Sequence, residues 1–216
     1  MTGQQLADKA RDVAEKHKSL YVMGGFGAPL NKQNKERYTG PSAHEYNRRP
    51  ERTAMIKAAD ADCYAVDCVG LIKMLLWGWN GNKDRVYGGA VYQSNGVPDI
   101  GANTMITKCS GISDDFGDMS KLLPGEMLWK QDHAGLYIGN GLAVECTPMW
   151  ANKVQITACN CAKQGFNRRD WAKHGRLPWI NYEPQSTVTA ADLNVILEKA
   201  QALVADLQQL LQRAGG

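Results

Sequence analysis

The feature that most constrains the fold is an apolar run that begins directly after an acidic residue and a cysteine. The segment reads Asp67-Cys68-Val69-Gly70, and the run Leu71–Trp77 follows it. Asp67 suits the N-cap of a helix, so the pattern predicts a buried helix with Cys68 in its first turn. Unpaired amides and the helix dipole at such a position favour a thiolate. Cys68 is therefore a candidate nucleophile, and we expect its pKa to be lowered and its alkylation to be selective.

A second constraint is a hairpin signal later in the chain. His133 begins an apolar strand, the turn Gly139-Asn140-Gly141 follows it, and a second strand carries Glu145. Folding the chain at this turn places Glu145 across from Leu136 or so, where a diagonal neighbour lies within side-chain reach of His133. Cys68, His133 and Glu145 then supply a nucleophile, a base and a group that orients the base.

Composition favours a soluble globular protein with one domain and an appendage. The 216 residues are 44% hydrophobic and 22% charged, and the net charge is +3. The basic clusters are too short to indicate a nucleic-acid partner. No apolar run reaches the length of a membrane span, and residues 1–9 lack the apolar core of a signal peptide.

Six cysteines are spaced in no pattern of a small disulfide scaffold, which favours free thiols. Cys159 and Cys161 have no matching pair of ligands nearby, so we expect neither a metal nor another cofactor. Strand alternation turns Cys146 away from Glu145, which favours a role in core packing.

Four segments can be compared as a set, in chain order: Tyr21-Val22-Met23-Gly24-Gly25, Asp67-Cys68-Val69-Gly70-Leu71, Pro124-Gly125-Glu126-Met127-Leu128 and His133 to Gly141. In these segments and their order the chain resembles the NlpC-like cell-wall cysteine peptidases, a papain-related family that cleaves peptidoglycan stem peptides. The resemblance covers residues 21 to about 148 and departs from the family at Val69, where a Ser is usual, and at Glu145, where His or Asn is more common.

The resemblance implies an α+β fold with a papain-like NlpC-type core. The nucleophile helix would pack on an antiparallel sheet that carries His133 and Glu145. We expect a catalytic domain over residues 1–184 with two long insertions, 26–62 and 80–123. Both insertions are rich in Gly, Asn and charged residues, and we expect them to be mostly irregular.

The resemblance also implies hydrolysis of an amide bond in the stem peptide. Cys68 would attack, with its own backbone amide as an oxyanion donor, His133 would transfer the proton, and Glu145 would orient the imidazole. We expect Tyr21 and Trp129 to contact the substrate, although Tyr21 also suits a half-buried strand aromatic. The favoured activity is a D-glutamyl endopeptidase, and an N-acetylmuramoyl-L-alanine amidase is the alternative.

A different class of function stays open, namely a protein that binds the wall without cutting it or a structural phage protein. Together with the absence of a signal peptide, the resemblance suggests a phage endolysin. Such an enzyme is made in the cytoplasm and reaches the cell wall after holin-type release.

The other histidines differ in their placement. His44 lies in the first insertion and is the only rival of His133 as the base, whereas His17 and His174 suit structural roles. After a linker that begins at residue 185, apolar residues recur at alternating spacings of four and three over residues 189–214. This heptad pattern predicts an amphipathic helix that either packs on the catalytic domain or forms a homo-oligomer.

Overall fold

The structure is a computed structural model that describes residues 1–182 together with 194, 197–201, 204 and 208. The chain divides into two compact units, 1–182 and 183–216. The few described positions in the second unit are helical and exposed. The predicted heptad helix and its self-association otherwise lie outside the described residues.

The helix that begins at Cys68 is the buried centre of the first unit. Helix α5 (Cys68–Leu76) begins where predicted, because the Asp67 carboxylate accepts a hydrogen bond from the Gly70 amide at 2.5 Å. All nine of its residues are buried, and it packs against β2 (Phe26–Pro29), β6 (His133–Tyr137) and β7 (Leu142–Thr147). Its first turn lies against the loop that contains Gly25. The two approach so closely that a Cβ on Gly70 would meet the Gly25 carbonyl oxygen at 1.9 Å.

A seven-stranded sheet covers one side of this helix. Its order is β4-β10-β5-β6-β7-β8-β9, and all neighbours are antiparallel except β8 and β9, which are parallel. In chain order the strands are β4 (Ser110–Ser113), β5 (Met127–Lys130), β6 (His133–Tyr137), β7 (Leu142–Thr147), β8 (Lys153–Cys159), β9 (Arg168–Arg169) and β10 (Lys173–Arg176).

A second, three-stranded sheet lies beside α5. Strand β3 (Tyr64–Val66) is central, parallel to β1 (Ser19–Tyr21) and antiparallel to β2 (Phe26–Pro29). Helix α1 (Gly3–Lys16) packs against β8 and α5. Strand β3 leads directly into α5, so this sheet fixes where Cys68 emerges.

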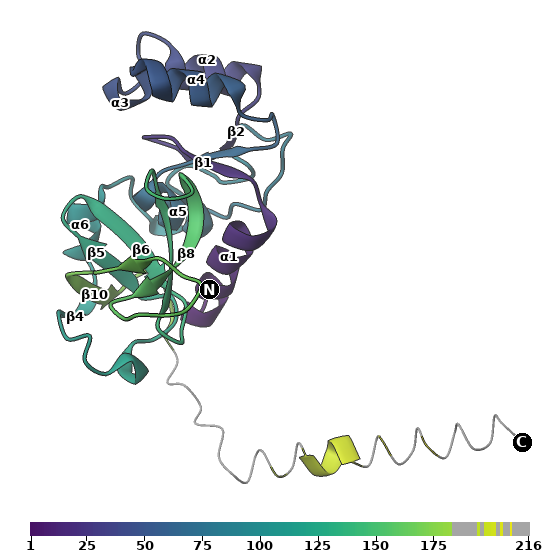
Figure 1. Cartoon of the computed structure of the whole chain (residues 1–216), viewed down its shortest axis with the longest axis vertical. Coiled ribbons are helices and arrows are strands. Elements are labelled where there is room, and N and C mark those ends of the chain that lie inside the picture. Colours follow the sequence, from purple (N-terminus) through teal and green to yellow (C-terminus); the bar gives the residue numbers. More distant parts are fainter. Residues whose placement is uncertain (183–193, 195–196, 202–203, 205–207, 209–216) are drawn as a thin grey trace, which may run out of the picture. The chain divides into compact units, whose positions relative to one another are not determined.

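The first insertion is helical, so the prediction of an irregular segment is wrong there. It contains α2 (Lys32–Thr39), α3 (Glu45–Arg48) and α4 (Pro50–Ala58), which lie together beyond the three-stranded sheet (Figure 1). These helices are short and bury few apolar residues; α2 buries only Asn34 and Tyr38. Their sequence therefore shows no apolar stripe that could have revealed them.

The second insertion is closer to expectation. It consists mostly of turns, with the short helix α6 (Ala102–Ile106), strand β4 and two 3₁₀ turns at Ser94–Gly96 and Met119–Lys121. The fold is thus a mixed α+β fold in which helix α5 packs on a largely antiparallel sheet. No helix within the described residues is long and apolar enough to cross a membrane.

Candidate active site

His133 and Glu145 form a direct pair on the sheet. His133 Nε2 lies 2.7 Å from Glu145 Oε2. The predicted hairpin forms, but its register differs by one residue, because Glu145 pairs with Gly135 and not with Leu136. A shift of one residue moves a side chain to the other face of a strand. The observed register puts Glu145 on the face of Gly135 and His133, which allows the contact.

Glu145 is fully buried, and two further side chains besides His133 bind its carboxylate. Arg169 Nε donates to both carboxylate oxygens at 3.1 and 3.0 Å, and Arg169 Nη2 lies 2.9 Å from Oε2. The Thr157 hydroxyl donates to Oε1 at 2.9 Å. Burial opposes the charged form, but the hydrogen bonds and charges of His133 and Arg169 outweigh it and lower the pKa of Glu145. The carboxylate is therefore ionised at neutral pH.

The charge on Glu145 determines which nitrogen of His133 carries the proton. A carboxylate only accepts hydrogen bonds, so Nε2 must be the donor, and Nδ1 of the neutral ring is left as the basic atom. The ring stacks on Trp171 with centroids 5.4 Å apart and planes 5° apart. Gly135 makes room for this indole, since a Cβ there would meet it at 2.7 Å. The imidazole is thus fixed both in its plane and at its edge.

The Cys68 thiol lies at the start of the strand that His133 begins. Its sulfur is 3.9 Å from the Asp132 carbonyl oxygen, and it also lies near the Ala134 amide. The residues on both sides of His133 therefore contact Cys68.

Burial and the neighbouring Asp67 carboxylate raise the pKa of Cys68 to about 12, although the Ala134, Val69 and Cys68 amides oppose the rise. The predicted lowering of this pKa is wrong, because burial outweighs the helix terminus.

A cleft of about 540 Å³ opens beside the thiol. Both insertions contribute to its walls, the first through His44 and the second through residues at the start of α6. Helix α5 supplies Lys73, whose ammonium forms an ion pair with Asp99 at 2.5 Å. The residues that line the cleft are Tyr21, Met23, Gly24, His44, Asp67, Cys68, Val69, Lys73, Gly101, Ala102, Asn103, Thr104 and Asp132.

The two predicted substrate contacts differ in their placement. Tyr21 lines the cleft and is buried; burial, with Cys68 and Asp67 nearby, raises its pKa well above the ordinary value. Trp129 is not among the lining residues. Its indole instead donates to the Asn103 side chain at 3.0 Å, and Asn103 lines the cleft. Trp129 therefore supports a wall of the cleft from behind.

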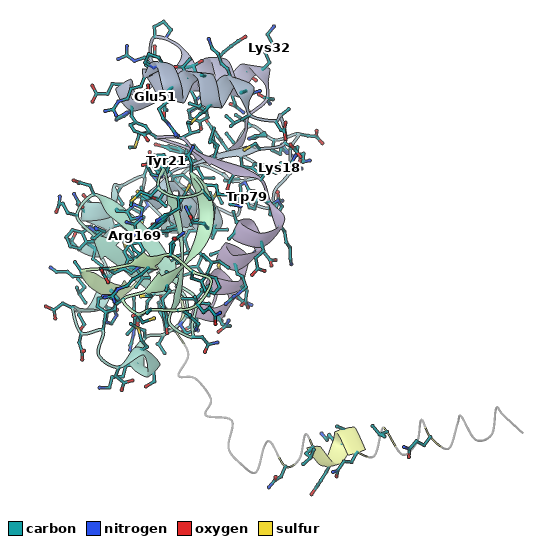
Figure 2. The ribbon with its side chains drawn as sticks, in the orientation of Figure 1. Lys18, Tyr21, Lys32, Glu51, Trp79 and Arg169 are labelled. Carbon is teal, nitrogen blue, oxygen red and sulfur yellow. The ribbon has the colours of Figure 1, made fainter. Side chains whose placement is uncertain are left out.

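The helical insertion is attached to the Tyr21 side of the cleft by buried polar contacts. Asn47 accepts from the Met23 amide at 2.9 Å and donates to the Met23 carbonyl at 2.8 Å. Arg52 donates to the Tyr21 carbonyl and, at 2.9 Å, to Asn152. Figure 2 shows Tyr21 between the insertion helices and the part of the sheet that carries Arg169. The insertion is therefore part of the structure that positions the cleft.

The remaining histidines lie apart from the His133–Glu145 pair. His44 lines the cleft, and its Nδ1 accepts from the Tyr46 amide at 3.1 Å, so this nitrogen is not a free base. His174 is buried, and its Nδ1 lies 2.6 Å from Glu126. His17 caps the end of α1 and packs edge-on against Trp79.

The six cysteines are free thiols. Cys146 is fully buried, and its thiol donates to the Val66 carbonyl at 3.2 Å. Among the described residues, no group of three His, Cys, Asp or Glu side chains is arranged to hold a metal ion.

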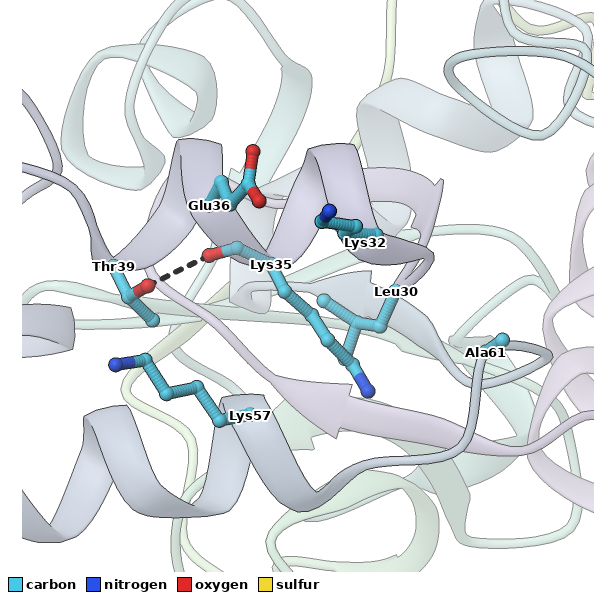
Figure 3. Close-up of a pocket in the computed structure, with 7 residues that line it drawn as sticks. All are labelled: Leu30, Lys32, Lys35, Glu36, Thr39, Lys57 and Ala61. Atoms are coloured by element: carbon cyan, nitrogen blue, oxygen red, sulfur yellow. Dashed lines mark hydrogen bonds between the residues drawn. The ribbon is translucent and has the colours of Figure 1, made fainter.

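A separate cavity of about 310 Å³ lies between α2 and α4 (Figure 3). Its lining includes Lys32, Lys35 and Lys57 and contains none of the predicted site residues. The ammonium groups point in different directions in Figure 3, and that of Lys35 donates to the Ala59 carbonyl at 2.5 Å.

Sequence reasoning missed three partners of the His133–Glu145 pair. Thr157 lies on β8, two residues beyond Gln155, which pairs directly with Glu145 on β7. The pairing of these two strands would have revealed this diagonal neighbour. Arg169 was visible only as part of a short basic cluster, and Trp171 gave no signal. Both come from the segment around β9, and local patterns do not encode the parallel pairing of that short strand with β8.

Comparison with known proteins finds a similarity to a solved structure but no match to a family model or a curated protein. Among solved structures, the fold is similar to that of NlpC2 from Trichomonas vaginalis, with a TM-score of 0.39 and 14% sequence identity. The similarity covers 81% of this chain and 46% of that one, so the chain spans about half the length of the structure that it matches.

Proposed function

We propose that this protein is a thiol hydrolase that uses Cys68, His133 and Glu145 to cleave an amide bond in peptidoglycan stem peptides. One observation supports the chemistry most strongly. A histidine is paired at 2.7 Å with a buried, ionised carboxylate, and the residues on either side of that histidine contact a cysteine at a helix start. A cleft of about 540 Å³ beside that cysteine gives a substrate room to reach the sulfur.

In the proposed mechanism the resting nucleophile is a neutral thiol, because the pKa of Cys68 is raised to about 12. The proton therefore has to leave as the sulfur attacks the carbonyl carbon. His133 Nδ1 accepts it, and Glu145 stabilises the imidazolium through Nε2. Arg169 and Thr157 keep the carboxylate in place during this step. The role of Glu145 is thus to orient the imidazole and to stabilise the imidazolium that forms during the attack.

The remaining steps use the same groups. The oxyanion of the tetrahedral intermediate accepts a hydrogen bond from the Cys68 amide at the positive end of α5. As the C–N bond breaks, Nδ1 returns its proton to the leaving amine, which leaves a thioester on Cys68. A water molecule then gives a proton to Nδ1 and attacks the thioester. The new carboxylic acid departs, and the thiol regains its proton.

The substrate class rests on the four sequence segments that resemble the NlpC-like peptidases. They favour a D-glutamyl endopeptidase, and an N-acetylmuramoyl-L-alanine amidase would use the same chemistry. Digestion of purified peptidoglycan, followed by mass spectrometry of the new amino termini, distinguishes the two bonds. Release of stem fragments with a new amine after D-glutamate supports the endopeptidase, whereas release of whole stem peptides supports the amidase.

A non-catalytic wall-binding or structural phage protein is the proposal of another class. Pull-down with insoluble peptidoglycan and lytic activity separate the two. Binding without release of any fragment from several wall types would favour the binder. Fragment release by the wild type, and its loss in Cys68→Ser, would favour the hydrolase.

We further propose an endolysin-type role on the bacterial cell wall and self-association through residues 189–214. Joining catalytic domains would increase the number of contacts to a polymeric wall without new chemistry. Truncation after Pro184 should then give a monomer that cuts soluble stem peptides normally and clears intact walls more slowly. Light scattering of the full chain tests this, and a monomeric full chain would contradict it.

A further inference from the structure

The turn between β5 and β6 contains a backbone conformation that residues other than glycine rarely adopt. Asp132 has φ of 61°, in the left-handed region, and Lys130 pairs with His133 on either side of the turn. The same residue presents its carbonyl oxygen to the Cys68 sulfur at 3.9 Å. One left-handed residue therefore both contacts the nucleophile and directly precedes the base.

Asn103, at the start of α6, ties this turn to the second insertion. Its side-chain oxygen accepts from the Asp132 amide at 3.0 Å and from the Trp129 indole at 3.0 Å. Its side-chain amide donates to Asp132 Oδ1 at 2.6 Å. Three hydrogen bonds from one side chain thus connect the insertion to the strand before the turn and to the turn itself.

These bonds lie at the exposed rim of the cleft, where water competes for each group. A single exposed hydrogen bond adds little to the stability of a fold. Its effect on a local conformation can be larger, because a left-handed residue is retained only when its surroundings select it. Asn103 has the donor and the acceptor in the positions that select this conformation of Asp132.

We propose that Asn103 is a positioning residue that holds Asp132 in its left-handed conformation and thereby sets the Cys68 thiol relative to His133. This inference rests on the proposed function for its effect on turnover. It gives the second insertion a role in the chemistry, since α6 supplies the residue. It also explains why Trp129, which does not line the cleft, is hydrogen-bonded at this point.

An exchange of the two side chains tests the proposal. Asn103→Ala removes the three bonds, and we expect kcat to fall roughly tenfold with a smaller change in KM. Asn103→Asp places two carboxylates against each other and should lower kcat further. In the double variant Asn103→Asp/Asp132→Asn the donor and the acceptor are exchanged and the net charge equals that of the wild type. Because Asn also tolerates the left-handed region, the double variant should recover most of the activity.

The second-order rate of Cys68 alkylation by iodoacetamide, followed by peptide mapping, gives a readout that needs no substrate. We expect it to fall in both single variants and to recover in the double variant. Thr107→Ala, at the exposed C-terminal end of α6, is the matched control and should change neither the alkylation rate nor kcat.

The proposal is overturned if Asn103→Ala matches the wild type in alkylation and kcat, or if the double variant is no better than Asn103→Asp. A wild type that fails to cut peptidoglycan but shows the expected alkylation pattern would contradict the function alone.

Discussion

Two clusters of His, Glu and Arg lie on the same sheet and resemble each other closely. In the first, His133 and Glu145 are 2.7 Å apart and Arg169 binds the carboxylate. In the second, His174 lies 2.6 Å from Glu126, and Arg176 lies 3.4 Å from the same carboxylate. Distance alone therefore does not distinguish a catalytic pair from a structural one.

The surroundings of the two clusters do differ. Cys68 lies at the start of the strand that carries His133, whereas His174 is inside β10 and packs edge-on against Phe116. The second cluster also has a thiol nearby, that of Cys109. Burial and the neighbouring Glu126 carboxylate raise the pKa of this thiol to about 12.

That thiol contacts Met127 and the Met105 carbonyl, whereas His174 pairs with Leu128. Strand alternation puts Met127 and Leu128 on opposite faces, so Cys109 and His174 lie on opposite sides of the sheet.

The arginines differ as well. The Arg169 side chain is 9% exposed and binds both carboxylate oxygens of Glu145, while that of Arg176 is 50% exposed and makes one long contact with Glu126. A buried bidentate arginine fixes the position of a carboxylate better than an exposed one. A cysteine at the start of the histidine's strand and a rigidly held carboxylate, more than the His–Glu contact itself, therefore distinguish the candidate active site from the second cluster.

The largest contrast should come from removing each histidine. His133→Ala removes the proposed base, and we expect turnover to fall by roughly 10⁴-fold or more with little loss of fold. His174→Ala should leave turnover within a few-fold but lower the melting temperature, because it leaves the buried Glu126 with only a half-exposed partner. Peptidoglycan digestion and thermal melts check both variants. Equal losses of activity in the two would remove the distinction.

A smaller contrast is expected for the carboxylates. Glu145→Gln keeps the size of the side chain but weakens the orientation of His133, and turnover should fall by roughly 10²-fold. The matched variant Glu126→Gln should change stability more than turnover. Kinetics on soluble stem peptides and denaturant unfolding measure the two effects. Activity of Glu145→Gln within a few-fold of the wild type would exclude Glu145 from the catalytic group.

The arginines should give the smallest contrast, best seen as a function of pH. Arg169→Met removes a group that lowers the pKa of Glu145, so that pKa rises and the acid limb of kcat/KM moves to higher pH. Arg176→Met should leave the limb in place. A limb that does not move in Arg169→Met would contradict the role of Arg169.

The free energy of unfolding should depend on pH in the same direction. The lowered pKa of Glu145 contributes stability that is fully present above the unfolded pKa of about 4.3 and is lost as the pH falls through the lower folded pKa. Arg169→Met should reduce that contribution. Denaturant unfolding at neutral and acidic pH measures it.

Part of the site could be predicted from sequence because the signals are local. The N-cap Asp67 fixed the start of α5, and the Gly139-Asn140-Gly141 turn brought Glu145 to His133. The alignment could be given only approximately, with Glu145 near Leu136, and the structure pairs Glu145 with Gly135, since a turn with three such residues allows neighbouring alignments. Local turn chemistry thus predicted the His133–Glu145 pair on one face of the hairpin but not the exact register.

The rest depends on contacts that are distant in the sequence. Arg169 reaches Glu145 only because β9 joins the sheet beside β8, and the pKa of Cys68 depends on how deeply the whole fold buries it. The insertion helices bury polar residues such as Asn47 and Arg52, which an apolar pattern cannot reveal. These features follow from tertiary packing, and no window of sequence contains them.

The central claim, that Cys68 is the nucleophile, is tested most directly by partial alkylation of the full-length wild type. Aliquots taken during treatment with iodoacetamide are assayed on peptidoglycan, and the modified fraction of each of the six cysteines is mapped by mass spectrometry. Cys161, the one cysteine that is not buried, serves as the internal control. If Cys68 is the nucleophile, the remaining activity equals the unmodified fraction of Cys68 and is independent of the modification of Cys161 and Cys109. Full activity with Cys68 modified would contradict this claim.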